Sequence, residues 1–179
     1  TTRGEAENSI PLIKMGNIKE GRFVYKKLEL VDESVIDSSY LLSSGDLLFN
    51  TRNTPEMTGK VAVWRNDYPI ATFDNNLLRL RFDKRVNPFF MGNLLTSDAI
   101  YLKFRGLVTG SNSVAAIYWK DLSRMKLNLP PIAEQDKITE ILLKIENSLE
   151  AKIQKNEKLK NMKKGLMQDL LTGKVRVKV

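Results

Sequence analysis

Two short motifs in this chain combine residue types that could do chemistry. Asn87-Pro-Phe-Phe90 resembles the Asn-Pro-Pro-aromatic motif with which amino-methyltransferases hold a base that has left the helical stack. Asp136, taken with Glu150-Ala-Lys152, offers the acidic and basic side chains of a metal-dependent nuclease site. The first motif would indicate methyl transfer and the second would indicate phosphodiester hydrolysis.

Neither motif is sufficient for its reaction. The second proline of the methyltransferase motif is absent, and no glycine-rich cofactor loop precedes Asn87. An Asn followed by Pro is instead a good helix start, because Asn caps a helix and Pro fits its first turn. Asp136 and Glu150 would lie about 21 Å apart along one helix, so they could not share a metal ion within a chain. We therefore expect no catalytic residue and no metal site.

The composition excludes further enzyme classes. The chain has no histidine and no cysteine, so it lacks the commonest general base and any Ser-His-Asp or Cys-His arrangement. Its net charge of +8 and pI of about 9.6 favour a polyanionic partner. No apolar run is long enough to span a membrane, and the first residues do not resemble a signal peptide. We expect a cytoplasmic protein without a membrane partner.

Residues 131–172 are predicted to form one long helix. Pro131 suits a first helical position, so the helix should start near Ile132. Acidic residues follow this start and lysines gather toward the end, as the helix dipole favours. Apolar or small polar residues recur about every 3.56 residues, a spacing between those of a coiled coil and an ideal helix. This seam comprises Ile138, Leu142, Ile145, Leu149, Ile153, Asn156, Leu159, Met162, Leu166 and Leu170.

The seam predicts a partner for the helix. A helix of this length is roughly 60 Å long, more than the rest of the chain can cover fully. Asn156 is the kind of polar seam residue that fixes register and partner number. Gly165 would let a second helix approach closely. We expect a homodimer formed through this helix. The alternative is an amphipathic helix folded back on its own domain.

Residues 1–130 are predicted to form a domain of mixed strands and helices. Two helices are expected, from about Phe89 to Leu95 and from Ser97 to Phe104, with a loop at Gly106–Ser113 and a turn at Lys120–Met125. This order favours an α+β fold, a mixed domain followed by a long C-terminal helix of the coiled-coil type. Residues 173–179 form a short tail that alternates like an edge strand. The strand candidates are Ile10–Ile18, Arg22–Val31, Asp46–Asn50, Lys60–Trp64, Ile70–Phe73, Leu77–Phe82 and Val114–Trp119.

Several segments occur in the order seen in one protein family. They are Ile10–Ile18, Ser44–Phe49, Gly59–Val63, Gly110–Trp119 and Leu127–Pro131, together with the helix entry Pro130–Gln135 and the exit Leu170–Lys174. With them the chain resembles a specificity subunit of a type I restriction-modification system. By this resemblance, residues 1–130 are a target recognition domain and residues 131–172 are a helical conserved region.

The chain departs from the family pattern in two ways. Family members usually have a further strand region before the segment that resembles Ile10–Ile18, which leaves open a truncation at the start. The usual subunit also holds two recognition domains and two helical regions, whereas this chain has one of each. It therefore resembles half a subunit.

The resemblance implies a function. The recognition domain would read one half of a bipartite site in double-stranded DNA. Two chains would pair their helices antiparallel, so the half-sites would be inverted copies. Modification subunits that bind S-adenosylmethionine would dock on the helices and methylate a flipped adenine. A restriction subunit is a further candidate partner, and this chain itself would hold no cofactor.

A DNA reader needs particular residue types, and two loops concentrate them. Arg and Lys meet guanine acceptors, Asn bonds adenine, and cations with small hydroxyls hold phosphates. The loops are Asn50–Thr54 with Lys60, and Thr109–Ser113 after Lys103 and Arg105. We expect base contacts from Arg52 and Asn53, phosphate or base-edge contacts from Lys60, Arg105, Ser111 and Asn112, and weaker contributions from Lys14, Asn17 and Arg22.

Other interpretations stay open from the residues alone. Each reader candidate could be a solvated loop residue or a turn former, as Gly45-Asp46 is expected to be. Gly59 and Gly110 could supply backbone conformations that other residues avoid. The chain could be a coiled-coil scaffold whose basic domain contacts RNA or protein, or an inactive half-subunit that competes for partners. Duplex binding that depends on a methyltransferase would separate these functions.

Overall fold

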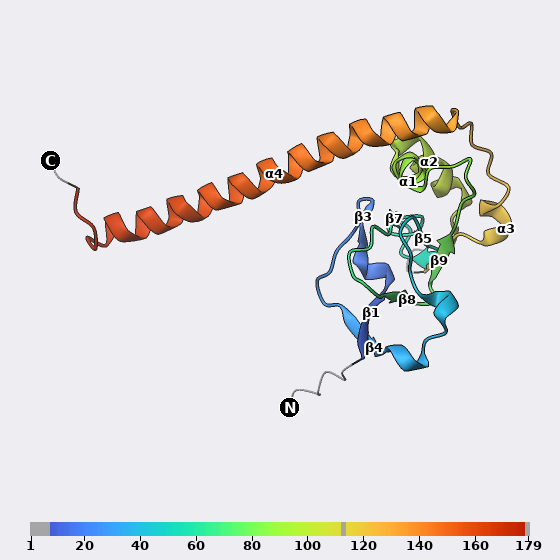
Figure 1. Ribbon diagram of the computed structural model, residues 1–179, viewed down its shortest axis with the longest axis horizontal. Helices are drawn as coiled ribbons and strands as arrows, with labels where there is room; N and C mark the ends of the chain where they lie inside the picture. Colours follow the sequence, from blue (N-terminus) through green and yellow to red (C-terminus); the bar gives the residue numbers. More distant parts are fainter. Residues whose placement is uncertain (1–7, 112–113, 178–179) are drawn as a thin grey trace. The chain divides into compact units, whose positions relative to one another are not determined.

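The chain divides into two compact units in the computed structural model, which describes residues 8–111 and 114–177 (Figure 1). The N-terminal unit is Thr1–Asp136 and the C-terminal unit is Lys137–Val179. The long helix begins at Ile132, so its first turn belongs to the N-terminal unit. The boundary at residue 130 that the sequence suggested therefore lies slightly before the division into units.

The elements of the N-terminal unit are short. The strands are β1 (Ser9–Ile13), β2 (Ile18–Lys19), β3 (Arg22–Phe23), β4 (Glu29–Asp32), β5 (Leu47–Asn50), β6 (Arg52–Asn53), β7 (Val61–Val63), β8 (Thr72–Phe73), β9 (Leu77–Leu80), β10 (Thr109–Gly110) and β11 (Ala115–Ala116). The helices are α1 (Pro88–Thr96), α2 (Asp98–Leu107), α3 (Trp119–Leu122) and the start of α4 (Ile132–Leu171), and 3-10 turns lie at Met15–Asn17, Glu33–Val35 and Ser38–Tyr40.

The strands form small ladders rather than one large sheet. The orders are β7-β5-β9, β4-β1-β8, β10-β11-β6 and β2-β3. Neighbouring strands are antiparallel except β1 and β8, which run parallel. Short antiparallel ladders with helices grouped beside them confirm the predicted α+β class.

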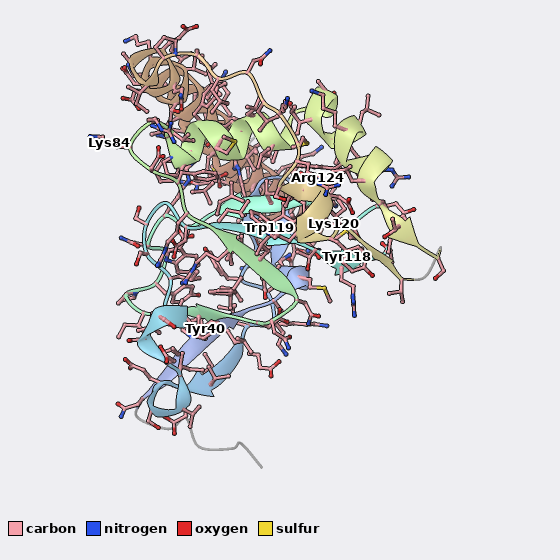
Figure 2. All side chains as sticks on the ribbon, turned by 90° about the vertical axis from the view of Figure 1, so that its right-hand side faces the viewer. Tyr40, Lys84, Tyr118, Trp119, Lys120 and Arg124 are labelled. Atoms are coloured by element: carbon pink, nitrogen blue, oxygen red, sulfur yellow. The ribbon has the colours of Figure 1, made fainter. Side chains whose placement is uncertain are left out.

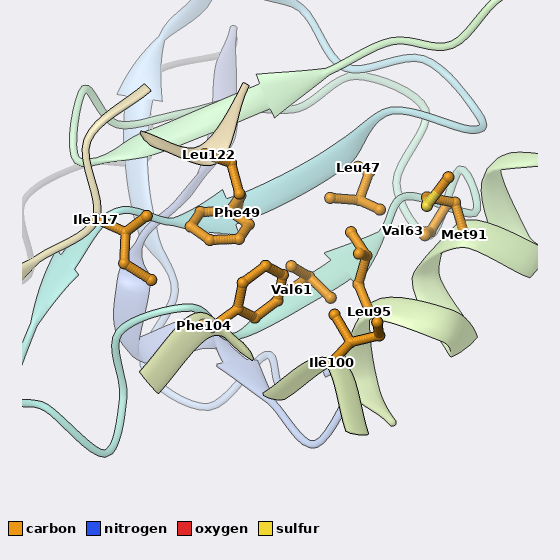
Figure 3. Close-up of a cluster of buried hydrophobic side chains, with 10 residues drawn as sticks. All are labelled: Leu47, Phe49, Val61, Val63, Met91, Leu95, Ile100, Phe104, Ile117 and Leu122. Atoms are coloured by element: carbon orange, nitrogen blue, oxygen red, sulfur yellow. The ribbon is translucent and has the colours of Figure 1, made fainter. Parts of the chain in front are cut away.

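Strand β5 organises the core because it is buried on both faces. Successive side chains of a strand point to opposite faces. Leu47 and Phe49 therefore enter a cluster that α1 and α2 complete, shown in Figure 3, while Leu48 enters a second cluster around Trp64. The rings of Phe49 and Phe104 meet edge to face, with centroids 5.2 Å apart.

Local structure confirms the predicted helix start and turn. The Asn87 side chain accepts hydrogen bonds from the N–H groups of Phe89, at 2.8 Å, and Phe90, at 3.1 Å, so it caps α1. The Asp46 carboxylate closes the predicted turn by accepting from the Ser43 N–H at 3.0 Å. Arg81 holds the same carboxylate through two bonds of 2.6 and 3.0 Å. The motif at Asn87 is thus a helix cap, and the motif at Gly45-Asp46 is a turn.

Several predicted boundaries were wrong. The strand expected over Ile10–Ile18 ends at Ile13, because a 3-10 turn follows at Met15–Asn17. The strand expected over Val114–Trp119 contains only Ala115–Ala116, because α3 begins at Trp119. Helix α2 continues to Leu107, into the expected loop.

The C-terminal unit consists of α4 beyond its first turn and the segment that ends it. Gly173 adopts a left-handed backbone, φ 72°, and its N–H donates to the Leu170 carbonyl at 3.2 Å. The Val175 N–H donates to the Asp169 carbonyl at 3.0 Å. These bonds stop the helix. The segment Lys174–Val179, which alternates like an edge strand, forms no strand over its described residues 174–177. Within residues 8–111 and 114–177, no helix is long and apolar enough to cross a membrane.

Candidate nucleic-acid interface

The β10-β11-β6 ladder brings the two predicted reader loops together. Ala116 of β11 lies opposite Arg52, and Ala115 lies opposite Asn53. The other edge of β11 pairs with Thr109 and Gly110. Ser111 then closes the hairpin, since its N–H donates to the Val114 carbonyl at 2.9 Å and its hydroxyl accepts from the Val114 N–H at 3.3 Å. Segments far apart in sequence therefore present their polar residues on one small sheet.

Gly110 is required for this hairpin. Its φ is 117°, a conformation that L side chains rarely adopt, and a Cβ there would meet the Val114 carbonyl oxygen at 2.4 Å. Gly59, with φ 88°, likewise has a left-handed backbone. These values confirm that both glycines supply unusual backbone conformations.

Arg52 and Asn53 occupy different environments. Arg52 is exposed, whereas Asn53 is partly buried on the opposite face of β6. The Asn53 amide nitrogen faces the Met15 sulfur at 3.7 Å, and its oxygen accepts from the Thr54 N–H at 2.8 Å. The first loop therefore contacts the segment that carries Lys14. Lys14 itself forms an ion pair with Glu29.

The loop between β6 and β7 is held by a residue that the sequence did not single out. Thr58 is fully buried, and its hydroxyl donates to the carbonyls of Thr54 at 3.0 Å and Ala115 at 3.3 Å. This threonine ties the first loop to β11. Lys60, which follows, is partly buried with its ammonium 3.1 Å from the Met57 sulfur.

Arg105 lies exposed in the last turn of α2. Its positive charge acts on Glu56, which follows the first loop. The pKa of Glu56 is lowered, first by its own backbone N–H, then by the Thr54 side chain, and least by the Arg105 charge. Arg105 therefore adds a cation beside the ladder.

The third predicted set, Lys14, Asn17 and Arg22, does not form one group in the structure. Asn17 is buried, its oxygen accepts from the Lys14 N–H at 2.9 Å, and its amide donates to the Val24 carbonyl at 3.0 Å. Both ends of this side chain are occupied within the fold, so placing Asn17 among DNA contacts needs correction: it stabilises the 3-10 turn. Arg22 is exposed but belongs to the separate β2-β3 ladder. Asn112 lies outside the described residues.

An exposed group at α3 was not anticipated from the sequence. Tyr118, Trp119, Lys120 and Arg124 lie around this helix, as Figure 2 shows. The signal in the sequence was two aromatic residues followed by a lysine. Tyr118 and Trp119 were expected to end a strand, in which one of the two rings would face the core.

Gln135 was also not anticipated as a structural residue, although it lies in the helix entry motif. It is only 1% exposed. Its side-chain oxygen accepts from the Asn87 N–H at 2.9 Å. Its side-chain nitrogen donates to the backbone carbonyls of Arg85 at 3.1 Å and Pro130 at 2.8 Å. These bonds attach the first turn of α4 to the segment before α1, which explains why this turn belongs to the N-terminal unit.

The seam of α4 is largely exposed within the C-terminal unit. Ile138 and Leu142 are partly buried. Toward the end of the helix, the exposed apolar side chains line a shallow groove. The apolar seam residues with more than two-fifths of their surface exposed are Ile145, Leu149, Ile153, Leu159, Met162, Leu166 and Leu170.

Charged side chains stabilise the same helix locally. Glu140 pairs with Lys144 at 2.5 Å and with Lys137 at 3.0 Å. These two lysines, Lys144 before Lys137, lower the pKa of Glu140 to about 2. Pairs at spacings of three and four residues lie on one helix face.

The arrangement of a mixed domain followed by a long helix is found in solved structures of type I restriction-modification proteins. The crystal structure of the HsdS subunit from Thermoanaerobacter tengcongensis matches 89% of this chain and 41% of that one, with a TM-score of 0.62 and 19% identity. A structure described for complex assembly and conformational transition of the type I R-M system matches 90% of this chain and 38% of that one, with a TM-score of 0.59 and 19% identity.

Sequence comparison then assigns the family. Residues 4–161 match the type I restriction modification DNA specificity domain, so this chain belongs to that family. It is 28% identical over 90% of its length to the putative type I restriction enzyme MjaX specificity subunit of Methanocaldococcus jannaschii. It is 27% identical over 96% of its length to the MjaVIII specificity subunit of the same organism. The chain spans 39% and 41% of these relatives. The family predicted from the sequence is confirmed.

Proposed function

We propose that this chain is a non-catalytic specificity component of a type I restriction-modification complex and reads one half of a bipartite site in double-stranded DNA. The observation that carries this proposal is the β10-β11-β6 ladder, which presents the exposed side chains of Arg52 and Ser111 from distant loops. Arg can hydrogen-bond guanine in the major groove, and small hydroxyls suit phosphates. Membership of the specificity-domain family supports DNA as the ligand.

The second part of the proposal concerns the helix. Helix α4 pairs antiparallel with a second copy, and the paired helices dock modification subunits. The exposed seam supports this, because it offers apolar surface along most of the helix. Since antiparallel pairing is twofold symmetric, the two half-sites are inverted copies.

The catalytic work belongs to partners in this proposal. Modification subunits bind S-adenosylmethionine and methylate adenine, while this chain holds no cofactor, and a restriction subunit is a further partner. The chain acts in the cytoplasm. A protein without cysteine suits this reducing compartment.

Selection from a randomised duplex pool tests the function. The full chain is mixed with a modification subunit, and the bound duplexes are sequenced. We expect enrichment of inverted half-sites at a fixed spacing. Arg52→Ala should relax the preference at one position of each half-site, whereas Arg85→Ala, also exposed in the N-terminal unit, should leave it unchanged. A pool that gains no common sequence would contradict the proposal.

A further inference from the structure

We propose that Tyr118, Trp119, Lys120 and Arg124 form a second DNA contact, which binds the sugar-phosphate backbone next to the reader loops (Figure 2). We call this group the α3 patch. The inference rests on the proposed function and adds a surface outside the reader loops. It concerns affinity rather than sequence preference, because contacts to the backbone carry no base information directly.

The two aromatic rings are exposed while their neighbours are anchored. Tyr118 is 54% exposed and Trp119 is 58% exposed. Ile117 and Leu122, on either side, are buried in the core cluster around Phe49. The chain leaves β11 and begins α3 at Trp119, so the alternation of a strand does not continue to bury one ring. The buried side chains of Ile117 and Leu122 therefore fix the segment that carries the two exposed rings.

The two cations of the patch, Lys120 and Arg124, are exposed to solvent. Among residues 8–111 and 114–177, the structure contains no ion pair from either of them. Asp121 lies between them in sequence, so residues 118–124 carry two positive charges and one negative charge. Exposed cations beside apolar rings favour an anion that also has apolar faces. A nucleic-acid backbone, with phosphates joined by sugars, has this chemistry.

The α3 patch continues from the reader ladder. The Ile117 N–H donates to the Thr51 carbonyl at 2.9 Å, and Ala116 lies opposite Arg52. Tyr118 therefore follows directly after the strand that positions Arg52. A duplex bound at Arg52 extends over many phosphates on either side of that contact, which gives a neighbouring surface of the same unit backbone to bind. A protein partner would have to offer acidic groups and apolar surface at the same place.

Tryptophan fluorescence gives a direct test. The chain has two tryptophans, Trp119 and Trp64, and Trp64 is only 1% exposed. Acrylamide quenching is measured on the full chain with and without a random-sequence duplex, while DNA anisotropy reports binding independently. The Trp119→Phe variant isolates Trp64 as the reference. We expect the duplex to protect Trp119 until its quenching approaches that of Trp64.

Charge variants provide a second readout. Lys120→Ala combined with Arg124→Ala should lower the slope of log affinity against log salt by about two, because each phosphate that a cation no longer neutralises lowers it by close to one unit. Lys84→Ala is the control for the loss of a surface charge, and Tyr40→Ala is the control for the loss of an exposed side chain without a charge; both residues lie away from α3 (Figure 2). Neither control should change affinity or slope.

The outcomes separate this inference from the proposed function. Duplex binding with unchanged quenching of Trp119 would overturn the α3 patch and leave the reader proposal standing. Protection of Trp119 on concentrating the protein without DNA would assign the patch to a second copy and overturn the inference. Failure of the wild-type chain to bind any duplex at low salt, alone or with a modification subunit, would contradict both proposals.

Discussion

The two units of this chain use apolar residues in opposite ways. The N-terminal unit buries them in two clusters on either side of β5, with Leu47 and Leu48 fully covered. The C-terminal unit leaves its seam exposed, with Leu149 at 52% and Leu166 at 57%. Long helices in proteins owe most of their stability to packing of an apolar face. The comparison teaches that the first unit has its own core, whereas the second leaves the apolar face of its helix uncovered, which supports the proposed pairing with a second copy.

The largest expected effect comes from breaking the N-terminal core. Phe104→Ala should destabilise this unit by about 3–5 kcal/mol, because it removes a fully buried ring that packs on Phe49. Urea denaturation followed by circular dichroism measures the change. Leu102→Ala, on the exposed side of the same helix, should change stability by less than about 0.5 kcal/mol.

Truncating an apolar side chain of the second unit sharpens the contrast between the two units. Leu159→Ala removes an exposed side chain, so it should barely alter the unfolding of a monomeric sample at low protein concentration. An effect as large as that of Phe104→Ala would show that the helix seam is already covered within one chain.

An intermediate effect is expected at the entrance to the helix. Gln135→Ala leaves the Asn87 N–H and the Arg85 and Pro130 carbonyls without their partner, which should cost about 1–3 kcal/mol. Hydrogen exchange at the Asn87 amide should accelerate in parallel. Gln154→Ala, on the exposed part of α4, is the control and should change neither. Unchanged exchange at Asn87 would show that the first turn of α4 is not anchored to the N-terminal unit.

The smallest expected effect is the pH response of the exposed helix. The pKa of Glu140 is lowered to about 2 by Lys144 and Lys137, from an ordinary value of 4.5. Its ion pairs therefore contribute fully above pH 4.5 and are lost as the pH falls through about 2. An NMR titration of the full chain measures this pKa. Lys144→Gln should move it toward 4.5, whereas Lys155→Gln should not; a wild-type value near 4.5 would show that these ion pairs do not form in solution.

The helix could be predicted from sequence because its signals are local. The start after Pro131, the repeat of apolar residues and the stop at Gly173 all depend on residues a few positions apart. The α+β class followed for the same reason, since short apolar runs between turn residues indicate strands. Periodicity does not identify what covers the seam, so it could only indicate a partner.

The site was less predictable because it depends on distant contacts. The polarity of Asn17 suggested a ligand contact, yet its partners in the fold are Lys14 and Val24. Thr58 and Gln135 gave no signal by residue type, since each acts through bonds to segments far away in sequence. Arg52 and Ser111 were chosen for their chemistry, and only the pairing of β6 with β11 brings their loops together.

The most direct test of the contrast between the units is the mass of the chain in solution. Light scattering coupled to size exclusion at two protein concentrations should give about twice the 20.4 kDa chain mass at the higher one. Leu149→Glu combined with Ile153→Glu should restore the monomer, because it places charges in the exposed seam. Asn147→Glu combined with Asn161→Glu adds the same charge outside the seam and should leave the dimer intact. A wild-type chain that is monomeric at both concentrations, or a dimer that survives the seam charges, would contradict the proposed pairing through α4.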